Sequence, residues 1–223
     1  MIRNVSNVKQ TMFVPVQGTN SWTDIPLKRL AGAPLWWQKT SALTHFLADY
    51  NLQQLHPETP FVWDTALSGV FWRPGRKEWQ AAGANLQIYF DFAKTPIDDR
   101  NLIAHSHGGQ VVFYALATGL EIRNLITFGT PVRDDMVIPI EIGRKRILGT
   151  WIHVVDKTFD RIQAEGEWFD GGWQYRSEFT MADLNDKIAN VEHSKLLNDP
   201  TCFHWWVDRA WTELLKGGTR QQS

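Results

Sequence analysis

Ser106 has the sequence surroundings of a catalytic nucleophile. It follows the apolar run 102–104 and lies within Ala104-His105-Ser106-His107-Gly108-Gly109. A serine on a sharp turn between a strand and a helix exposes its hydroxyl, and the turn requires small residues two positions before and two positions after it. Ala104 and Gly108 meet this requirement, although alanine stands where glycine is more usual. We therefore predict a nucleophile here rather than a serine that caps the following helix.

A serine nucleophile needs an imidazole that takes its proton and a carboxylate that orients the imidazole. Residues of both types occur late in the chain. Asp156 and Asp160 follow a predicted strand that ends at Val155, and His193 precedes a predicted C-terminal helix. The other candidates for the base are the remaining histidines outside the serine motif: His45, His56, His153 and His204.

The elements that must position these groups alternate along the chain. Short apolar runs and longer segments of helical periodicity predict one α/β domain over 1–223, with a mostly parallel sheet of five or six strands and helices on both faces. Predicted strands cover 11–16, 61–63, 102–105, 122–128 and 147–155, with a further candidate at 173–179. Predicted helices cover 34–50, 76–92, 110–117 and 203–215. The loops after residues 16, 105, 128 and 155 should then gather at the carboxyl ends of the strands, where such sheets bind ligands.

Several segments, taken together and in order, resemble the α/β-hydrolase superfamily, in particular its small lipase-like and esterase-like members. The motif at 104–109 is similar to the His-Ser-His-Gly-Gly form of lipase-like members, and Phe128-Gly129-Thr130-Pro131 is similar to the segment after their next strand. The resemblance extends over 11–211. It departs at Ala104 and at Gln17, where many members have a histidine before the glycine of the oxyanion loop.

The resemblance implies an α/β-hydrolase fold and a serine hydrolase that cleaves a carboxylic ester through an acyl-enzyme, without cofactor or metal. The family's chain order of serine, acid and histidine assigns Ser106, Asp160 and His193 to the triad. Asp160-Arg161-Ile162 is similar to the family's Asp-x-Val pattern, and Asp156 remains the alternative acid. His45 and His56 lie too early for this order, whereas His153 falls in a predicted strand and His204 in a predicted helix.

The resemblance also implies where the oxyanion of the tetrahedral intermediate is bound. The donors would be the backbone N–H of His107 and, in the loop after the first strand, that of Thr19, which follows Gly18. The same machinery would serve a phospholipase, a thioesterase or an amidase. The fold alone would also suit a binding module without catalysis.

Tryptophan is unusually abundant, with 12 residues. Most should lie in the core. Four fall in predicted loops at the active end of the sheet and are candidates for a substrate pocket: Trp22, Trp72, Trp168 and Trp173. Whether the loop 166–172 forms a lid is left open by the sequence.

Composition narrows the class of partner. A formal net charge of −1 gives no broad reason to expect nucleic acid, and no apolar run is long enough to cross a bilayer. The first ten residues lack the pattern of a signal peptide, so we expect a cytoplasmic protein whose partner is a small-molecule or lipid ester. His105-x-His107 and the acid pairs at 98–99 and 134–135 are expected to be structural, with no metal bound.

Overall fold

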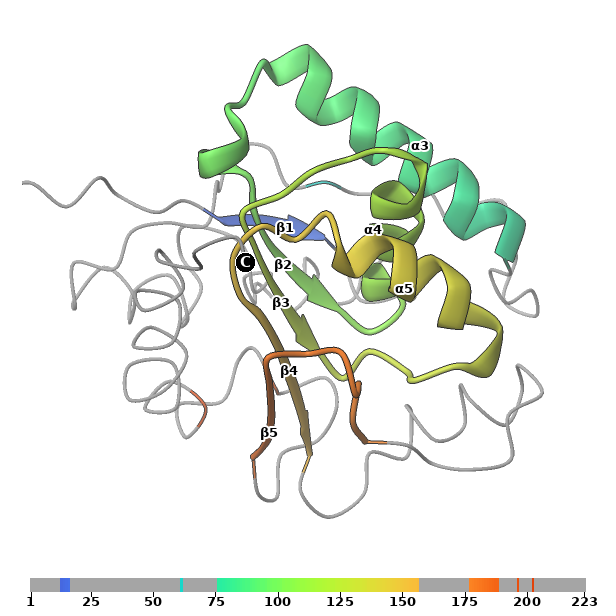
Figure 1. Ribbon diagram of the computed structural model, residues 1–223, viewed down its shortest axis with the longest axis vertical. Coiled ribbons are helices and arrows are strands. Elements are labelled where there is room, and N and C mark those ends of the chain that lie inside the picture. The colour runs from blue at the N-terminus through green and yellow to red at the C-terminus, as the bar shows by residue number, and fades with distance from the viewer. Residues whose placement is uncertain are drawn as a thin grey trace, which may run out of the picture.

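The computed structural model of the chain describes residues 13–16, 61, 76–156, 177–188, 196 and 202. Five strands form one parallel sheet in the order β1-β2-β3-β4-β5 (Figure 1). The strands are β1 Phe13–Val16, β2 Asn101–His105, β3 Asn124–Phe128, β4 Trp151–Asp156 and β5 Leu184–Ile188. The helices are α3 Arg76–Ala93, α4 Gly108–Thr118 and α5 Val137–Arg144, with short 3-10 helices η1 Ile97–Asp99 and η2 Asp134–Met136. The chain therefore has an α/β fold.

The order in which strands join the sheet reverses beside β1. Val16 pairs with Ala104 of β2 on one edge and with Phe61 on the other, and the Phe61 N–H donates to the Pro15 carbonyl at 3.0 Å. The chain thus runs from β1 to its outer edge and returns past β1 to form β2. In open parallel sheets, ligands bind beyond the strand ends at such a reversal. We therefore expect ligands to bind beyond the carboxyl ends of β1 and β2.

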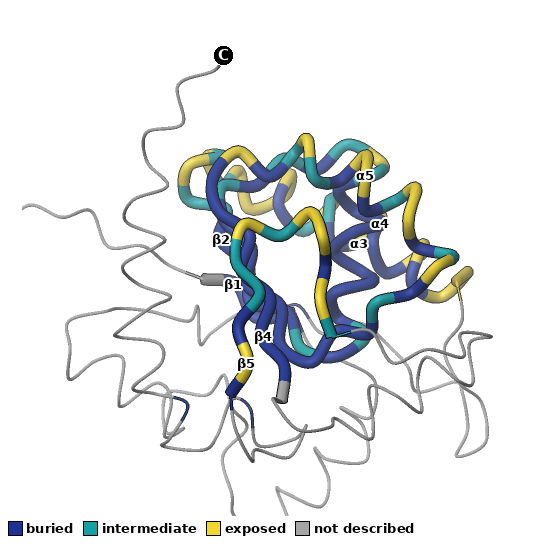
Figure 2. The backbone as a smooth tube through the Cα atoms, turned by 60° about the horizontal axis from the view of Figure 1, so that its bottom comes forward, coloured by how far each residue is buried: buried dark blue, intermediate teal, exposed yellow. Residues whose placement is uncertain are grey.

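The three helices pack on the same face of the sheet, with α4 between α3 and α5 (Figures 1 and 2). Residues 108–116 of α4 are all buried, as expected for a helix enclosed by a sheet and two other helices. α3 instead buries one stripe, which includes Trp79, Leu86 and Phe90. A Cβ on Gly83 would lie 2.8 Å from the backbone nitrogen of Ala115, so glycine allows α3 and α4 to approach closely. Among the described helices, none has the length and apolarity that a bilayer span requires.

Buried amides join the amino ends of β2, β3 and β4. The Asn124 side chain donates to Oδ1 of Asn101 at 2.8 Å, and its own Oδ1 accepts the Thr150 N–H at 2.9 Å. These groups are nearly excluded from solvent. Because a buried amide without a partner is costly, the contacts favour one alignment of the three strands.

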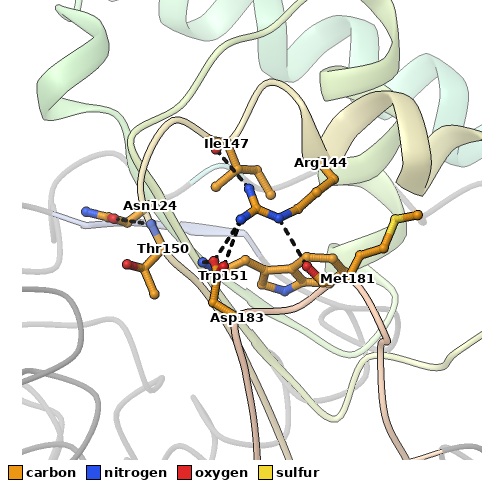
Figure 3. Close-up of polar contacts among 7 residues, drawn as sticks. All are labelled: Asn124, Arg144, Ile147, Thr150, Trp151, Met181 and Asp183. Atoms are coloured by element: carbon orange, nitrogen blue, oxygen red, sulfur yellow. Dashed lines mark hydrogen bonds and ion pairs between the residues drawn. The ribbon is translucent and has the colours of Figure 1, made fainter. Parts of the chain in front are cut away.

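An arginine fixes the connection between α5 and β4 (Figure 3). Nη2 of Arg144 donates to both carboxylate oxygens of Asp183 at 2.9 Å, and the other guanidinium nitrogens donate to the carbonyl oxygens of Ile147 and Met181. Asp183 also accepts the backbone N–H of Trp151 at 2.9 Å. The residues leading into β5 are thereby held against the start of β4.

Most predicted elements within the described residues are confirmed, with shifted ends. β1, β2, β3, α3 and α4 overlap their predicted ranges, whereas β4 begins at Trp151, and Ile147 forms only an isolated bridge with Ile122. The candidate strand at 173–179 is wrong in its last three residues, because 177–179 are not strand and the described strand that pairs with β4 is β5. The helices predicted at 34–50 and 203–215 lie outside the described residues. Helices on the second face of the sheet therefore remain a prediction.

Candidate active site

Ser106 occupies the turn between β2 and α4 in a left-handed backbone conformation. Its φ is +54°, a region that costs a residue other than glycine about 1–2 kcal/mol. The Ser106 N–H donates to the Phe128 carbonyl at 2.8 Å, and the Ser106 carbonyl accepts the Gly109 N–H at 3.1 Å and the Thr130 hydroxyl at 3.0 Å. The N-cap of α4 is His107. The alternative of a capping serine at Ser106 is therefore wrong.

The loop after β3 packs directly against this turn. A Cβ on Gly109 would overlap the Thr130 side chain, so only glycine fits at the start of α4. Gln110 donates to the Pro131 carbonyl at 2.7 Å, and the Gly129 N–H donates to the Val154 carbonyl of β4 at 2.8 Å. The carboxyl ends of β2, β3 and β4 are thus joined around Ser106 by backbone and side-chain hydrogen bonds.

His107 begins α4 beside the serine. Its backbone N–H lies at the N-terminal end of α4. The N-terminal end of a helix is also the positive end of its dipole and favours negative charge. The imidazole stacks on the indole of Trp79, with ring centres 5.1 Å apart and planes inclined by 24°. An oxyanion formed on a carbonyl attacked by Ser106 would therefore develop beside a suitable donor.

Asp156 is the last residue of β4 and pairs with Ile188 of β5. β4 ends on the same side of the parallel sheet as β2, which Ser106 follows, and β3 lies between these two strands. The other predicted site residues lie outside the described residues: Asp160, His193, Thr19, Trp22, Trp72, Trp168 and Trp173. Of the predicted set, the structure thus places Ser106 and His107 together and puts the backbone of Asp156 two strands away.

His153 lies inside β4, as predicted, and is completely buried. Its Nδ1 is 2.9 Å from the Thr127 hydroxyl, which also accepts the Trp151 indole N–H at 3.1 Å. The ring of Phe179 lies edge-on to the imidazole at 4.6 Å. Burial lowers the pKa of His153 to about 3, with a Thr127 backbone hydrogen bond acting in the opposite direction. His153 is therefore a neutral core residue at physiological pH.

Both acid pairs lie in short 3-10 helices, and one of their members has arginine partners. Residues 98–99 lie in η1, and residues 134–135 begin η2. Asp135 accepts hydrogen bonds from Arg133 at 2.8 Å and from Arg76 at 3.2 Å. Within the part of the chain that the structure describes, no three His, Cys, Asp or Glu side chains gather as metal ligands do.

Sequence reasoning missed two residues that adjoin the site, Trp79 and Arg133. Arg133 is 8% exposed, and its guanidinium lies 4.8 Å from the centre of the Trp79 ring. The sequence predicts Trp79 only as one of the tryptophans that lie in the core. The one local signal for Arg133 was its place just after the segment 128–131, which follows the strand next to the serine.

The described residues define an α/β protein with a strained serine between a strand and a helix. The serine lies at the carboxyl ends of the parallel strands, where such sheets bind ligands. No protein-family model, curated protein or solved structure matches this chain. The geometry around Ser106 is therefore the basis for assigning a function.

Proposed function

We propose that the chain is a serine hydrolase of the α/β-hydrolase fold that cleaves a carboxylic ester through an acyl-enzyme. The observation that carries the proposal is the backbone of Ser106, with φ +54° between β2 and α4. Strained backbone of this kind persists where surrounding contacts over-determine it, and it clusters at functional sites. A buried serine with only a packing role would not need it. In a nucleophile elbow, the same turn presents the hydroxyl to a substrate.

The topology supports the same fold. Phe61 and β2 flank β1 on opposite edges, so Ser106 follows one of the two strands at the reversal. Ligand sites of open parallel sheets occupy this position. The three helices on one face, with α4 directly after the serine, are also consistent with the arrangement of an α/β-hydrolase.

In the proposed reaction, the Ser106 oxygen attacks the ester carbonyl carbon while His193 takes the hydroxyl proton. The carbonyl oxygen becomes an oxyanion, which the backbone N–H groups of His107 and Thr19 stabilise. One such donor is commonly worth about 3–4 kcal/mol of transition-state stabilisation. The intermediate collapses to the acyl-enzyme, and the alcohol leaves with the proton from His193. Water then attacks the acyl carbon while His193 takes its proton. The second intermediate collapses, the acid is released, and His193 returns the proton to the Ser106 oxygen.

The test compares wild type with Ser106→Ala, using a fluorophosphonate probe and p-nitrophenyl esters of short and long acyl chains. We expect labelling of wild type alone, and a loss of ester turnover of about 10³-fold or more in Ser106→Ala. Ser177→Ala, at a partly exposed serine ahead of β5, is the matched control and should label like wild type. Absence of labelling and turnover in wild type would overturn the proposal.

The triad partners are tested in the same assay. His193→Ala should lose activity to nearly the same extent as Ser106→Ala, because the members of a triad act as a unit. Asp160→Asn should lower kcat by orders of magnitude, whereas Asp156→Asn should have a small effect. The reverse ranking would assign Asp156 as the acid, and full activity in both variants would show that neither residue is.

A further inference from the structure

A group of four side chains, which we call the Trp79 cluster, adjoins the residue after the proposed nucleophile; two of them are buried, Asp135 is partly buried and Arg76 is exposed. Its members are Trp79, Arg133, Asp135 and Arg76. Trp79 is completely buried, and its indole contacts both the His107 imidazole, with ring centres at 5.1 Å, and the Arg133 guanidinium, at 4.8 Å. A cation over an indole and a stacked aromatic ring are each attractive and each restrict orientation. The position of Trp79 is therefore coupled to that of His107.

Arg133 is itself held in one orientation. Its Nε and Nη2 both donate to the Asp135 carboxylate at 2.8 Å, and Nη2 of Arg76 lies 3.2 Å from the same carboxylate. Burial alone would raise the pKa of Asp135, but hydrogen bonds and charges from Arg133 and Arg76 lower it, so the carboxylate is ionised at neutral pH. A planar two-pronged pair of this kind fixes direction as well as distance.

The cluster joins the ends of three elements at the serine turn. Arg76 and Trp79 lie in the first turn of α3, Asp135 lies in η2, and the N-cap of α4 is His107. A buried ion pair is weak evidence for stability, since its desolvation can cancel its attraction. The buried Arg133 and its partly buried partner Asp135 are better explained by the orientation they impose than by the stability they add.

We infer that Trp79 and Arg133 are positioning residues that hold the backbone N–H of His107 where the oxyanion forms. The inference rests on the proposed serine hydrolase function. The imidazole and the N–H of residue 107 share one Cα, so fixing the ring on the indole restricts rotation of the peptide that donates. On the other side, Ser106 is fixed by its bonds to Phe128 and Thr130. An error of about 1 Å in such a position can cost about 100-fold in rate.

The first experiment compares Trp79→Leu with Trp151→Leu. Both tryptophans are completely buried, but Trp151 packs on Phe113 and Phe179 instead of on His107. We expect Trp79→Leu to lower kcat for a p-nitrophenyl ester by about 10- to 100-fold with little change in KM, because the donor acts mainly in the transition state. Trp151→Leu should lose a similar amount of thermal stability and keep kcat within about twofold, assayed below both unfolding transitions.

A second readout reports on the oxyanion directly. A trifluoromethyl ketone adds to the serine as a hemiketal whose oxygen is the analogue of the oxyanion. Its affinity should fall in Trp79→Leu and in Arg133→Met by the same factor as kcat/KM. Trp79→Phe, which retains a flat ring, should recover most of the loss. These milder changes keep the inference testable if the leucine variant fails to fold.

The outcomes separate the two proposals. If wild type reacts with the fluorophosphonate and Ser106→Ala does not, the serine hydrolase stands whatever the cluster variants do. Unchanged kcat and ketone affinity in folded Trp79→Leu or Arg133→Met would then overturn the positioning role alone. Equal losses of kcat in Trp79→Leu and Trp151→Leu would also overturn it, because the effect would be general destabilisation. A wild type that neither labels nor turns over an ester would overturn both proposals.

Discussion

The left-handed backbone at Ser106 predicts an unusual ranking of stability for two variants, Ser106→Gly and Ser106→Ala. Glycine adopts φ +54° without strain, whereas alanine retains the strain of serine. Removing the backbone strain stabilises the glycine variant by about 1–2 kcal/mol, whereas the greater freedom of glycine in the unfolded chain destabilises it by about 0.4–1 kcal/mol. Ser106→Gly should therefore be roughly 0.5–1 kcal/mol more stable than Ser106→Ala. For a chain of 223 residues, this corresponds to a Tm difference of about 1–4 °C.

Calorimetry or urea unfolding of the two variants, side by side, measures this difference. Position 94 is a positive control, because Lys94 also has a positive φ, +50°, and its glycine variant should again exceed its alanine variant. Ala81→Gly, at an exposed position inside α3, should go the other way and lose about 0.5–1 kcal/mol. A Ser106→Ala variant at least as stable as Ser106→Gly, with both controls behaving as stated, would refute the view that the turn stores strain.

Two further predictions concern His153 and Gly109. The pKa of His153 is about 3 in the folded protein and about 6.5 when the side chain is exposed. Below pH 6.5 the unfolded state therefore binds a proton that the folded state does not. As the pH is lowered, the free energy of unfolding should fall by up to about 1.4 kcal/mol per pH unit. Urea midpoints at pH 7, 6 and 5 should show this slope in wild type, and an equal slope in His153→Gln would contradict the assignment. Gly109→Ala should lower Tm through an overlap with Thr130 that costs about 1–3 kcal/mol, and adding Thr130→Ala should restore part of the loss; an unchanged Tm in the single variant would contradict the close approach.

The serine turn was predictable because its signals are local. An apolar run, a serine and two glycines lie within ten residues of sequence, and their types alone specify strand, turn and helix. The structure adds the reason for the second glycine, which is the proximity of Thr130. That contact joins the turn to the end of another strand, and no periodicity within either segment reports it.

β5 and the Trp79 cluster escaped prediction for a related reason. The sequence Leu184-Asn-Asp-Lys-Ile has no apolar alternation, and its strand conformation follows from pairing with β4. Asn185 also exchanges two hydrogen bonds of 2.9 Å with the backbone of Phe179, whose side chain is buried, so the aromatic residue marks a packed turn instead of a strand. The contacts among Trp79, His107 and Arg133 likewise join segments far apart in sequence. Such contacts depend on how three elements dock, which single-sequence patterns do not encode.

The amide pair between Asn101 and Asn124 bears on where this chain can change in length during evolution. β2 is anchored at its start by that pair and at its end by the bond from Ser106 to Phe128. Each residue of a strand advances the chain by about 3.3 Å. One insertion or deletion within 101–106 would therefore break one anchor or the other. We expect related chains to vary in length at exposed turns, such as the one at Lys94 after α3, and to keep this six-residue segment constant.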